Sequence, residues 1–303
     1  MAARTVEGVT RAGFVALVGR PNAGKSTLLN ALVGEHLAAV SDKVQTTRHR
    51  IPGFLTRNDT QIVFLDTPGL LDPRDPLQEA MLKTAVGSVK GVDAIYFLAD
   101  HDVPSGPETA LLAALAGAEV LLFLLLTKAD RASAARLKQR EEAWSRRAEW
   151  TSRHHVSALT GEGLESLLDA TCSALPLHPF FYEAEQLTDL SLRFLAAELV
   201  REACYEELSS ELPYRVHVEV NEWQEAPEPG GITRIGATLY VERESQKGIV
   251  IGEGGRRLKA IGTRARASIE TLLGSPVYLK QWVKVRPGWS RRDRDLRFFG
   301  YKP

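Results

Sequence analysis

The stretch GRPNAGKS, from Gly19 to Ser26, constrains the fold of this 303-residue chain more than any other feature. It fits the pattern G-x-x-x-x-G-K-[S/T], directly after an apolar run and directly before a helical pattern, and that context distinguishes a phosphate-binding loop from an incidental glycine turn. Glycines let the backbone point N–H groups at phosphate oxygens, and the start of the helix adds positive potential. We expect Lys25 to reach the β- and γ-phosphates and the Ser26 hydroxyl to ligate Mg²⁺. The residues expected to contact the nucleotide here are Asn22, Ala23, Gly24, Lys25, Ser26 and Thr27.

Short apolar runs alternate with helix-length segments up to about Ala174, which is typical of βαβ units. This predicts an α/β P-loop domain with a mostly parallel sheet and helices on both faces. A turn at Asn58-Asp59 predicts one antiparallel strand pair at the edge of the sheet. The expected strands are 14–18, 61–65, 94–99, 120–126 and the short pair 155–156.

The order of elements changes after Pro176 and Pro179, which break the pattern. A helix-like segment at 189–209 is followed by strand-like runs at 214–220 and 232–241, two helices, and a strand-like run at 277–285. This order favours a separate α+β domain. We therefore predict a nucleotide-binding domain at 1–176, a linker at 177–188 and a second domain at 189–303.

The tetrapeptide from Thr127 to Asp130 follows a buried strand, so Asp130 is expected at the strand's carboxyl end, where ligands of open α/β sheets bind. A carboxylate there can accept hydrogen bonds from guanine N1–H and N2–H₂, which adenine lacks, so the site favours GTP. Lys128 would lie along the purine, and Thr127 stands where an asparagine is the familiar residue. After the next strand, Ser157, Ala158 and Leu159 would place a backbone N–H near guanine O6.

The run FLDTPGLL ends a strand with Asp66, which we expect to hold Mg²⁺ through water, and the Gly69 N–H can contact the γ-phosphate. Thr46 and Thr47 lie in a polar loop, and one of them is expected to give the metal a second hydroxyl. The sequence does not distinguish the two. The next residue is Leu70, where the best-known GTP switches carry a glutamine that orients water. The candidate catalytic groups are therefore Lys25, Thr46, Thr47 and Gly69.

Charge is distributed unevenly although the formal net charge is zero. Residues 184–230 contain 3 Lys or Arg against 11 Asp or Glu, whereas residues 231–303 contain 16 against 6. Within the basic part, a G-x-x-G turn separates two helix-like segments, 245–251 and 256–273, as in KH modules that clamp single-stranded RNA. An acid, Glu253, lies in this turn and would repel phosphate. The candidate RNA-binding residues are Ile251, Gly252, Glu253, Gly254, Gly255, Arg256, Arg257, Lys259, Lys280, Lys284 and Arg286.

These motifs together resemble the Era family of GTPases over nearly the whole length. The resemblance rests on GRPNAGKSTLLNAL, QTTRHRI, DTPGL, TKAD, VSAL, ELPYRV, VERESQKGIVIGEGGRRLKAIG and WVKVRPGW. It implies a GTPase domain followed by a type II KH domain, with GTP or GDP and Mg²⁺ as cofactors. It further implies binding near the 3′ end of small-subunit (16S) ribosomal RNA and assistance in assembly of the 30S ribosomal subunit.

The resemblance also implies glutamine-independent hydrolysis, because the residue after DTPG is hydrophobic in this group. Several relatives bind K⁺ through the asparagine at the position of Asn22, so potassium is a candidate cofactor. Two cysteines, Cys172 and Cys204, are too few for a disulfide framework, and we expect a cytoplasmic monomer. Peripheral association with the inner face of the cell membrane is connected with the family, but no anchor or basic amphipathic helix requires it here.

Two other functions compete with a GTP-controlled RNA switch. The chain could be a constitutive RNA-binding chaperone whose nucleotide domain is structural and hardly turns over. A tRNA-modifying relative with a similar nucleotide domain is disfavoured, because we expect no additional catalytic or cofactor domain.

Overall fold

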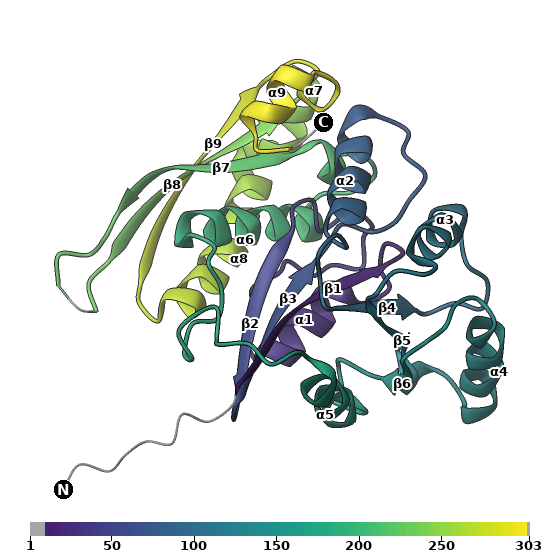
Figure 1. Ribbon diagram of the computed structural model, residues 1–303. Coiled ribbons are helices and arrows are strands. Elements are labelled where there is room, and N and C mark those ends of the chain that lie inside the picture. Colours follow the sequence, from purple (N-terminus) through teal and green to yellow (C-terminus); the bar gives the residue numbers. More distant parts are fainter. Residues whose placement is uncertain (1–9, 229, 302–303) are drawn as a thin grey trace, which may run out of the picture. The chain divides into compact units, whose positions relative to one another are not determined.

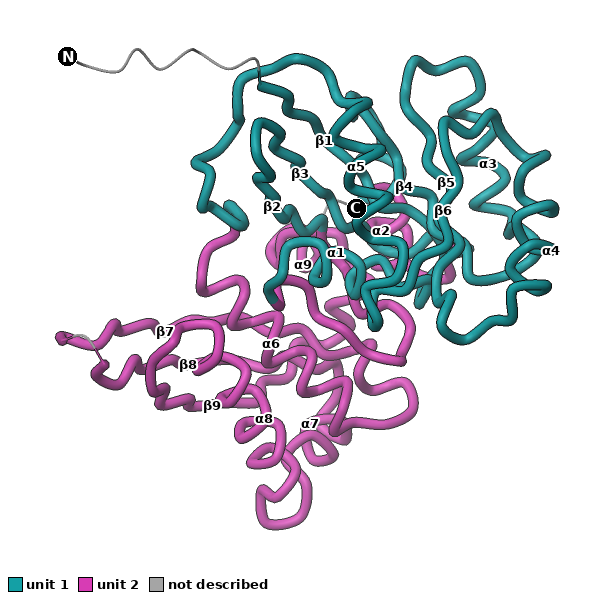
Figure 2. The backbone as a smooth tube through the Cα atoms, turned by 90° about the horizontal axis from the view of Figure 1, so that it is seen from below, with its two compact units in different colours: residues 1–35, 50–72, 84–189 teal, residues 36–49, 73–83, 190–303 magenta. Residues whose placement is uncertain are grey.

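The computed structural model describes residues 10–228 and 230–301 (Figure 1). These residues form two compact units, coloured separately in Figure 2. The N-terminal unit contains 10–35, Arg50–Asp72 and Thr84–Asp189. The C-terminal unit contains 190–301 and, in addition, two segments from earlier in the chain, His36–His49 and Pro73–Lys83.

The N-terminal unit is built on a six-stranded sheet in the order β2-β3-β1-β4-β5-β6. Neighbouring strands are parallel except β2 and β3, which pair antiparallel across the Asn58 turn. β3 and β4 are buried along their whole length, as expected of central strands covered on both faces. The predicted α/β fold and edge hairpin are confirmed. The strands are β1 (Arg11–Gly19), β2 (Ile51–Arg57), β3 (Thr60–Asp66), β4 (Ala94–Ala99), β5 (Leu121–Thr127) and β6 (Ser152–Val156).

Helices connect these strands and begin where local chemistry favours a helix start. Ser105 caps α3 in a reciprocal capping box with Glu108, and Ser133 caps α4 by accepting a hydrogen bond from the Arg136 N–H. Gly24 and Gly163 precede α1 and α5 in the left-handed conformation that glycine tolerates. The helices are α1 (Lys25–Val33), α2 (Pro76–Gly87), α3 (Gly106–Leu115), α4 (Ala134–Ser145) and α5 (Leu164–Ala174), with a short 3₁₀ helix η1 (Ala129–Arg131).

The predicted linker, 177–188, is packed against the N-terminal unit. Leu177 forms an isolated antiparallel bridge with Arg11. The Phe181 and Tyr182 N–H groups both donate to Gln61 Oε1, and the Tyr182 ring stacks on Phe54 at 3.8 Å. The buried Gln61 side chain thus uses its acceptor to fix this segment.

The C-terminal unit has the α-β-β-α-α-β order of a type II KH domain, as predicted. Its sheet has the order β7-β8-β9, with β7 antiparallel and β9 parallel to β8. Ile261, Ala265 and Ile269 of α8 recur at helical spacing along one face of the helix and lie in the core of this unit. The elements are α6 (Leu192–Glu207), β7 (His217–Gln224), β8 (Thr233–Val241), α7 (Glu244–Ile251), α8 (Arg256–Leu273), β9 (Val277–Val285) and α9 (Asp293–Phe298), with 3₁₀ helices η2 (Pro213–Arg215), η3 (Glu253–Gly255) and η4 (Trp289–Arg291).

The strand expected at 214–220 is displaced toward the C-terminus. Residues Pro213–Arg215 form the 3₁₀ turn η2, and β7 begins only at His217. Pro213 explains the difference, because its fixed φ suits the first position of a helical turn and it has no N–H to donate to a sheet.

A second core cluster in the C-terminal unit was not apparent from the sequence. Leu77, Ala80 and Met81 of α2 pack with the aromatic residues that follow β9, namely Trp289, Phe299 and Tyr301. The segment after the sequence DTPGLL is therefore anchored by the end of the chain.

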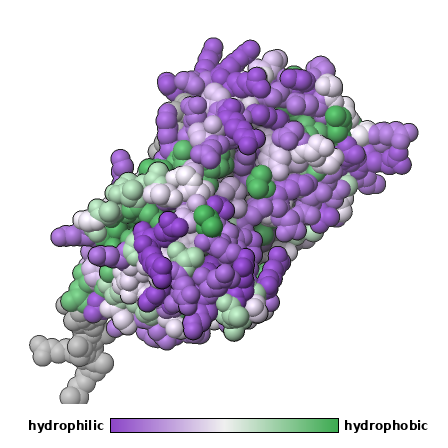
Figure 3. All heavy atoms as spheres, turned by 90° about the vertical axis from the view of Figure 1, so that its right-hand side faces the viewer, coloured by the Kyte–Doolittle hydropathy of each residue, from purple (hydrophilic) through white to green (hydrophobic). Residues whose placement is uncertain are grey.

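None of the described helices is both long enough and apolar enough to cross a membrane. Figure 3 shows one face of the molecule, on which hydrophilic residues predominate and hydrophobic ones occur mostly in small groups. Small exposed hydrophobic groups are ordinary on protein surfaces.

Candidate functional site

The phosphate-binding loop lies between the end of β1 and the start of α1, where the sequence placed it. Gly24 has a φ of +95° and open space where a Cβ would be. A Cβ at Gly19 would lie 2.4 Å from Leu98 O, and a Cβ at Gly69 would lie 2.5 Å from Pro21 N. Glycine is thus required both to shape the loop and to bring the DTPG segment against it.

Lys25 is buried within this loop, and its Nζ donates to Gly19 O at 3.1 Å and Arg20 O at 2.8 Å. Burial lowers the pKa of Lys25 from 10.5 to about 8, partly offset by the negative charges of Asp66, Asp100 and Glu108. A phosphate beside Nζ would favour the charged amine. The side chain is therefore placed to exchange backbone carbonyls for phosphate oxygens.

The two groups predicted to hold Mg²⁺ at the start of α1 and the end of β3 lie together. The Ser26 hydroxyl donates to Asp66 Oδ2 at 2.6 Å, and Asp66 is fully buried. A hydroxyl and a carboxylate beside a phosphate site are oxygen ligands of the kind that Mg²⁺ prefers. The residues present thus fit a magnesium ion.

Thr46 and Thr47 are buried in the segment that belongs to the C-terminal unit. The Thr46 hydroxyl donates to Lys43 O at 2.8 Å. Lys43 Nζ in turn donates to Tyr205 O and, at 2.5 Å, to Leu208 O at the end of α6. The loop that carries the candidate metal ligands is therefore bonded to the first helix of the KH-like unit.

Arg48 extends this attachment and was not singled out in the sequence. Its guanidinium is buried and donates to Val216 O at 2.9 Å, Pro213 O at 3.1 Å and the Tyr205 hydroxyl at 3.1 Å. The same hydroxyl donates to Gln45 O at 2.8 Å. The Tyr205 hydroxyl thus bonds two residues of this segment, Gln45 and Arg48, and connects them to α6.

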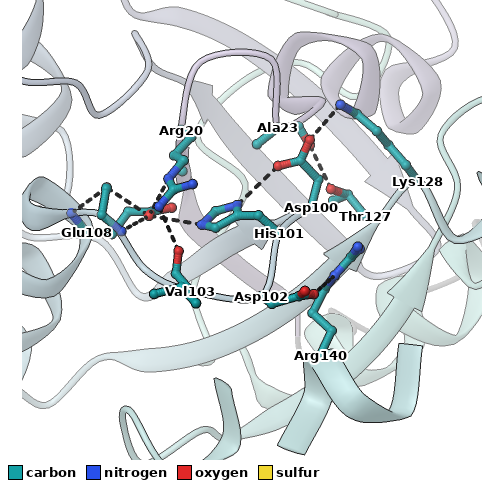
Figure 4. A network of polar contacts seen from close by, with 12 residues as sticks. Arg20, Ala23, Asp100, His101, Asp102, Val103, Glu108, Thr127, Lys128 and Arg140 are labelled. Atoms are coloured by element: carbon teal, nitrogen blue, oxygen red, sulfur yellow. Dashed lines mark hydrogen bonds and ion pairs between the residues drawn. The ribbon is translucent and has the colours of Figure 1, made fainter. Parts of the chain in front are cut away.

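The base-side residues lie at the carboxyl ends of β5 and β6, as predicted. The Thr127 hydroxyl donates to Ala23 O at 2.8 Å, so threonine does brace the phosphate-binding loop in place of asparagine (Figure 4). Asp130 lies on η1 with its side chain partly exposed, and Lys128 holds the left-handed conformation with its Nζ 2.7 Å from Asp100 Oδ2. After β6, Ser157 is buried, Ala158 is half-buried and Leu159 is exposed.

Leu70 is buried, and its N–H donates to Gly19 O at 3.0 Å. The leucine side chain has no polar atom, and it is packed in the protein interior. It therefore offers neither a hydrogen-bonding group nor exposed surface with which to orient water.

The G-x-x-G turn joins α7 and α8, and Gly252, Gly254 and Gly255 all have positive φ. A Cβ at Gly252 would lie 2.8 Å from Arg257 Cβ, whereas one at Gly255 would meet open space. Glu253 forms an ion pair with Arg256 and so offsets one positive charge of the turn. Arg257 donates to Ile249 O at 2.9 Å, and Lys259 is exposed.

β9 and the residue after it carry the remaining predicted cations. Lys280 and Lys284 are exposed, and the Lys280 amine lies 4.8 Å from the centre of the Trp282 ring. Arg286 differs, because it forms a 2.6 Å ion pair with Asp295 and is half-buried. Lys280 and Lys284 are thus better placed than Arg286 to meet a polyanion.

Two protein-family models match separate parts of this chain. A family model described as "50S ribosome-binding GTPase" matches residues 14–128, and one described as "KH domain" matches residues 211–290. The protein is a P-loop GTPase that carries a KH domain. The GTPase part is defined by the strand, phosphate loop and helix together with the TKAD segment, and the KH part by the αββααβ unit.

Similar proteins identify the family more narrowly. The chain is 41% identical to GTPase Era of Geobacter metallireducens over 96% of this chain and 98% of the relative, and 44% identical to GTPase Era of Mesorhizobium japonicum over 96% and 94%. A crystal structure of an Aquifex aeolicus Era variant bound to GDP and AlF₄⁻ superposes with a TM-score of 0.90 at 36% identity, covering 97% of this chain and all of that one. A structure of Era with MgGDPNP and part of 16S ribosomal RNA gives 0.89 at 36% identity, with the same coverage. The chain therefore belongs to the Era family of GTPases.

Proposed function

We propose that this GTPase is a switch whose nucleotide state controls docking of its KH domain on small-subunit ribosomal RNA near the 3′ end, and that it assists assembly of the 30S subunit in the cytoplasm. The observation that carries the proposal is the placement of residues 36–49. This segment contains Thr46 and Thr47, one of which is expected to ligate Mg²⁺, and its residues Lys43, Gln45 and Arg48 are hydrogen-bonded to residues 205–216. We therefore expect a rearrangement of this segment on nucleotide exchange to change its hydrogen bonds to the first helix of the KH domain.

The RNA-binding part of the proposal rests on the G-x-x-G turn and β9. Open backbone at Gly254 and Gly255 allows phosphate to approach, while Lys259, Lys280 and Lys284 add exposed positive charge. The Era complex with 16S ribosomal RNA supports this class of ligand. RNA affinity should therefore fall steeply with salt.

Hydrolysis is proposed to proceed without a glutamine. Lys25, the Gly69 N–H and one of Thr46 and Thr47 are the groups of this chain expected to stabilise charge and orient water, and Ser26 and Asp66 would hold Mg²⁺. When bound, the metal supplies positive charge to the phosphate oxygens. The buried Leu70 takes no part.

The RNA prediction concerns Gly255→Asp. A Cβ there meets no atom within 4 Å, so the change adds a negative charge and a strained φ of +78° to the turn without a clash. We expect RNA binding to weaken by about tenfold or more while GTP affinity stays within about twofold, because two or more phosphate contacts are repelled. Binding is measured with a labelled 16S 3′-end fragment and with fluorescent GDP.

Gly274→Asp is the matched control. Gly274 also has open space and a positive φ, +61°, but it ends α8 instead of starting it. If both variants lose RNA binding equally, the loss reflects backbone strain, and the assignment of the G-x-x-G turn as the element that binds RNA phosphates is wrong.

A potassium ion is proposed as a second cofactor, held in part by Asn22. This residue is exposed on the phosphate loop with a φ of +62°. A monovalent cation near the phosphates would offset charge that an arginine finger offsets elsewhere. We expect hydrolysis to rise at least threefold when K⁺ replaces Na⁺, and Asn22→Ala to flatten that response to about the same rate in both salts. An unchanged potassium response in the variant would remove Asn22 from the ion site.

One measurement, GTP hydrolysis with and without RNA, separates the proposed switch from a constitutive RNA-binding chaperone. A switch hydrolyses GTP at a rate that RNA alters, whereas a structural nucleotide domain would retain GTP unhydrolysed with or without RNA.

A further inference from the structure

A chain of polar contacts in the N-terminal unit joins the two ends of the nucleotide site behind the phosphate loop (Figure 4). It begins at Lys128, whose Nζ lies 2.7 Å from Asp100 Oδ2 at the end of β4. His101 follows, with Nδ1 3.2 Å from Asp100 Oδ1 and Nε2 3.1 Å from Glu108 Oε2 on α3. Glu108 Oε2 also accepts from Arg20 Nε, in the phosphate loop, at 2.9 Å.

Glu108 connects His101 to the phosphate-loop residue Arg20 in this chain of contacts. Its side chain is completely buried, and Oε2 accepts four hydrogen bonds, from Arg20, His101, the Ser105 N–H at 2.7 Å and the Ser105 hydroxyl at 2.8 Å. These donors outweigh the opposing effect of burial and hold the pKa of Glu108 below its ordinary value. The carboxylate is therefore anionic at neutral pH and requires positive partners.

His101 is the titratable member between two carboxylates. Both ring nitrogens face a carboxylate oxygen, so only the imidazolium can donate at both contacts, whereas neutral histidine leaves one lone pair facing an acceptor. Burial and the charge of Arg20 oppose protonation, but the hydrogen bonds of Asp100 and Glu108 prevail and raise the pKa of His101 above 6.5. Nearby groups from α4 are Trp144, whose Nε1 donates to His101 O at 2.8 Å, and Arg136 and Arg140, which both pair with Asp102.

Asp100 is likewise held as an anion. Hydrogen bonds from His101 and Lys128 overcome the effect of burial, so the pKa of Asp100 lies well below its ordinary value. When His101 is protonated, the chain thus alternates in sign, from Lys128 through Asp100, His101 and Glu108 to Arg20.

We propose that His101 is a positioning residue whose imidazolium form ties the guanine-side Lys128 to the phosphate-loop Arg20, so that the protein holds nucleotide more tightly when His101 is protonated. As pH rises through its raised pKa, the bridge loses one charge-assisted hydrogen bond, and Lys128 and the loop are no longer braced together. The proposal rests on the assignment of Lys128 to the guanine site.

The test measures dissociation of fluorescent mant-GDP from the full-length protein, chased with unlabelled GDP in excess Mg²⁺, between pH 6 and 8.5. A bound phosphate favours the charged form of Lys25, whose own pKa is about 8 without ligand. His101→Gln retains Lys25, so any pH dependence that comes from this amine persists in that variant and is separated from the contribution of His101. We expect dissociation to become roughly five- to tenfold faster across this range, the size expected from losing part of one charge-assisted hydrogen bond. His101→Gln, which cannot titrate, should dissociate fast at every pH.

Two further variants make the result specific. His178→Gln removes a histidine ring of the same unit whose Nδ1 lies 2.6 Å from Pro179 O, and it should follow the wild-type profile. Arg20→Gln leaves His101 in place but cuts the chain at the phosphate loop, so it should dissociate faster and lose most of the pH dependence. If His101→Gln or Arg20→Gln keeps the wild-type profile, or if the wild type binds mant-GDP with no pH dependence, the proposal is overturned. If the wild type binds no mant-GDP, the nucleotide site itself is wrong.

Discussion

Asp130→Asn should lower the affinity for GTP by about 100-fold and raise the affinity for XTP, the xanthine nucleotide. The asparagine amide turns its N–H₂ group toward the guanine 2-amino group, so two donors face each other, and each unpaired polar group costs about 1–3 kcal/mol. Xanthine has a carbonyl at the same place and accepts the new donor. Competition of GTP and XTP against mant-GDP gives both affinities.

Asp169→Asn provides the control for this exchange, because Asp169 lies on α5 of the same unit and pairs with Arg57 at the surface. It should leave both affinities unchanged. An Asp130→Asn protein that still prefers GTP would show that guanine is recognised elsewhere.

Lys25→Met should slow GTP hydrolysis in the nucleotide-saturated protein by about 100- to 1000-fold, the range for removing one preorganised donor to transition-state charge. Methionine is one heavy atom shorter but keeps an unbranched, buried side chain, so the loop should persist, while the amine that now bonds Gly19 O and Arg20 O is lost. Single-turnover hydrolysis at saturating GTP measures the change.

Leu70→Ala is the natural comparison, because Leu70 is bonded through its backbone to the same Gly19 carbonyl. Its rate should stay within about threefold of the wild type, since its side chain is buried and carries no polar group. A large loss in Leu70→Ala, or a loss under tenfold in Lys25→Met, would mean that the catalytic groups have been wrongly chosen.

The positions of many candidate nucleotide-site residues could be predicted because they follow the strands of a parallel sheet. Asp66, Thr127 and Ser157 each end or follow a strand whose apolar run is visible in the sequence, and parallel strands bring such positions to one edge. Asp100 obeys the same rule at the end of β4, so that rule could have singled it out. What it bonds, however, depends on His101 and Glu108 in a loop and a helix cap that show no periodic pattern.

The attachment of residues 36–49 to the KH unit could not be read from the sequence. Arg48 is charged and lies in a polar loop, where exposure is the ordinary expectation. It is buried because its acceptors come from Tyr205, Pro213 and Val216, between 157 and 168 residues away along the chain. No local pattern encodes such a pairing, and the anchoring of Leu77 and Met81 by Trp289 is equally non-local.

The central claim, that nucleotide state controls RNA docking through this segment, is tested most directly by RNA affinity in two nucleotide states. A labelled 16S 3′-end fragment is titrated with the protein saturated with MgGDPNP or with MgGDP, in the wild type and in Tyr205→Phe, which removes the hydroxyl that bonds both Gln45 and Arg48. The account predicts at least a fivefold difference in Kd between the two states of the wild type, or about 1 kcal/mol of coupling, and a clearly smaller difference in Tyr205→Phe. Equal affinity in both states of the wild type would contradict it.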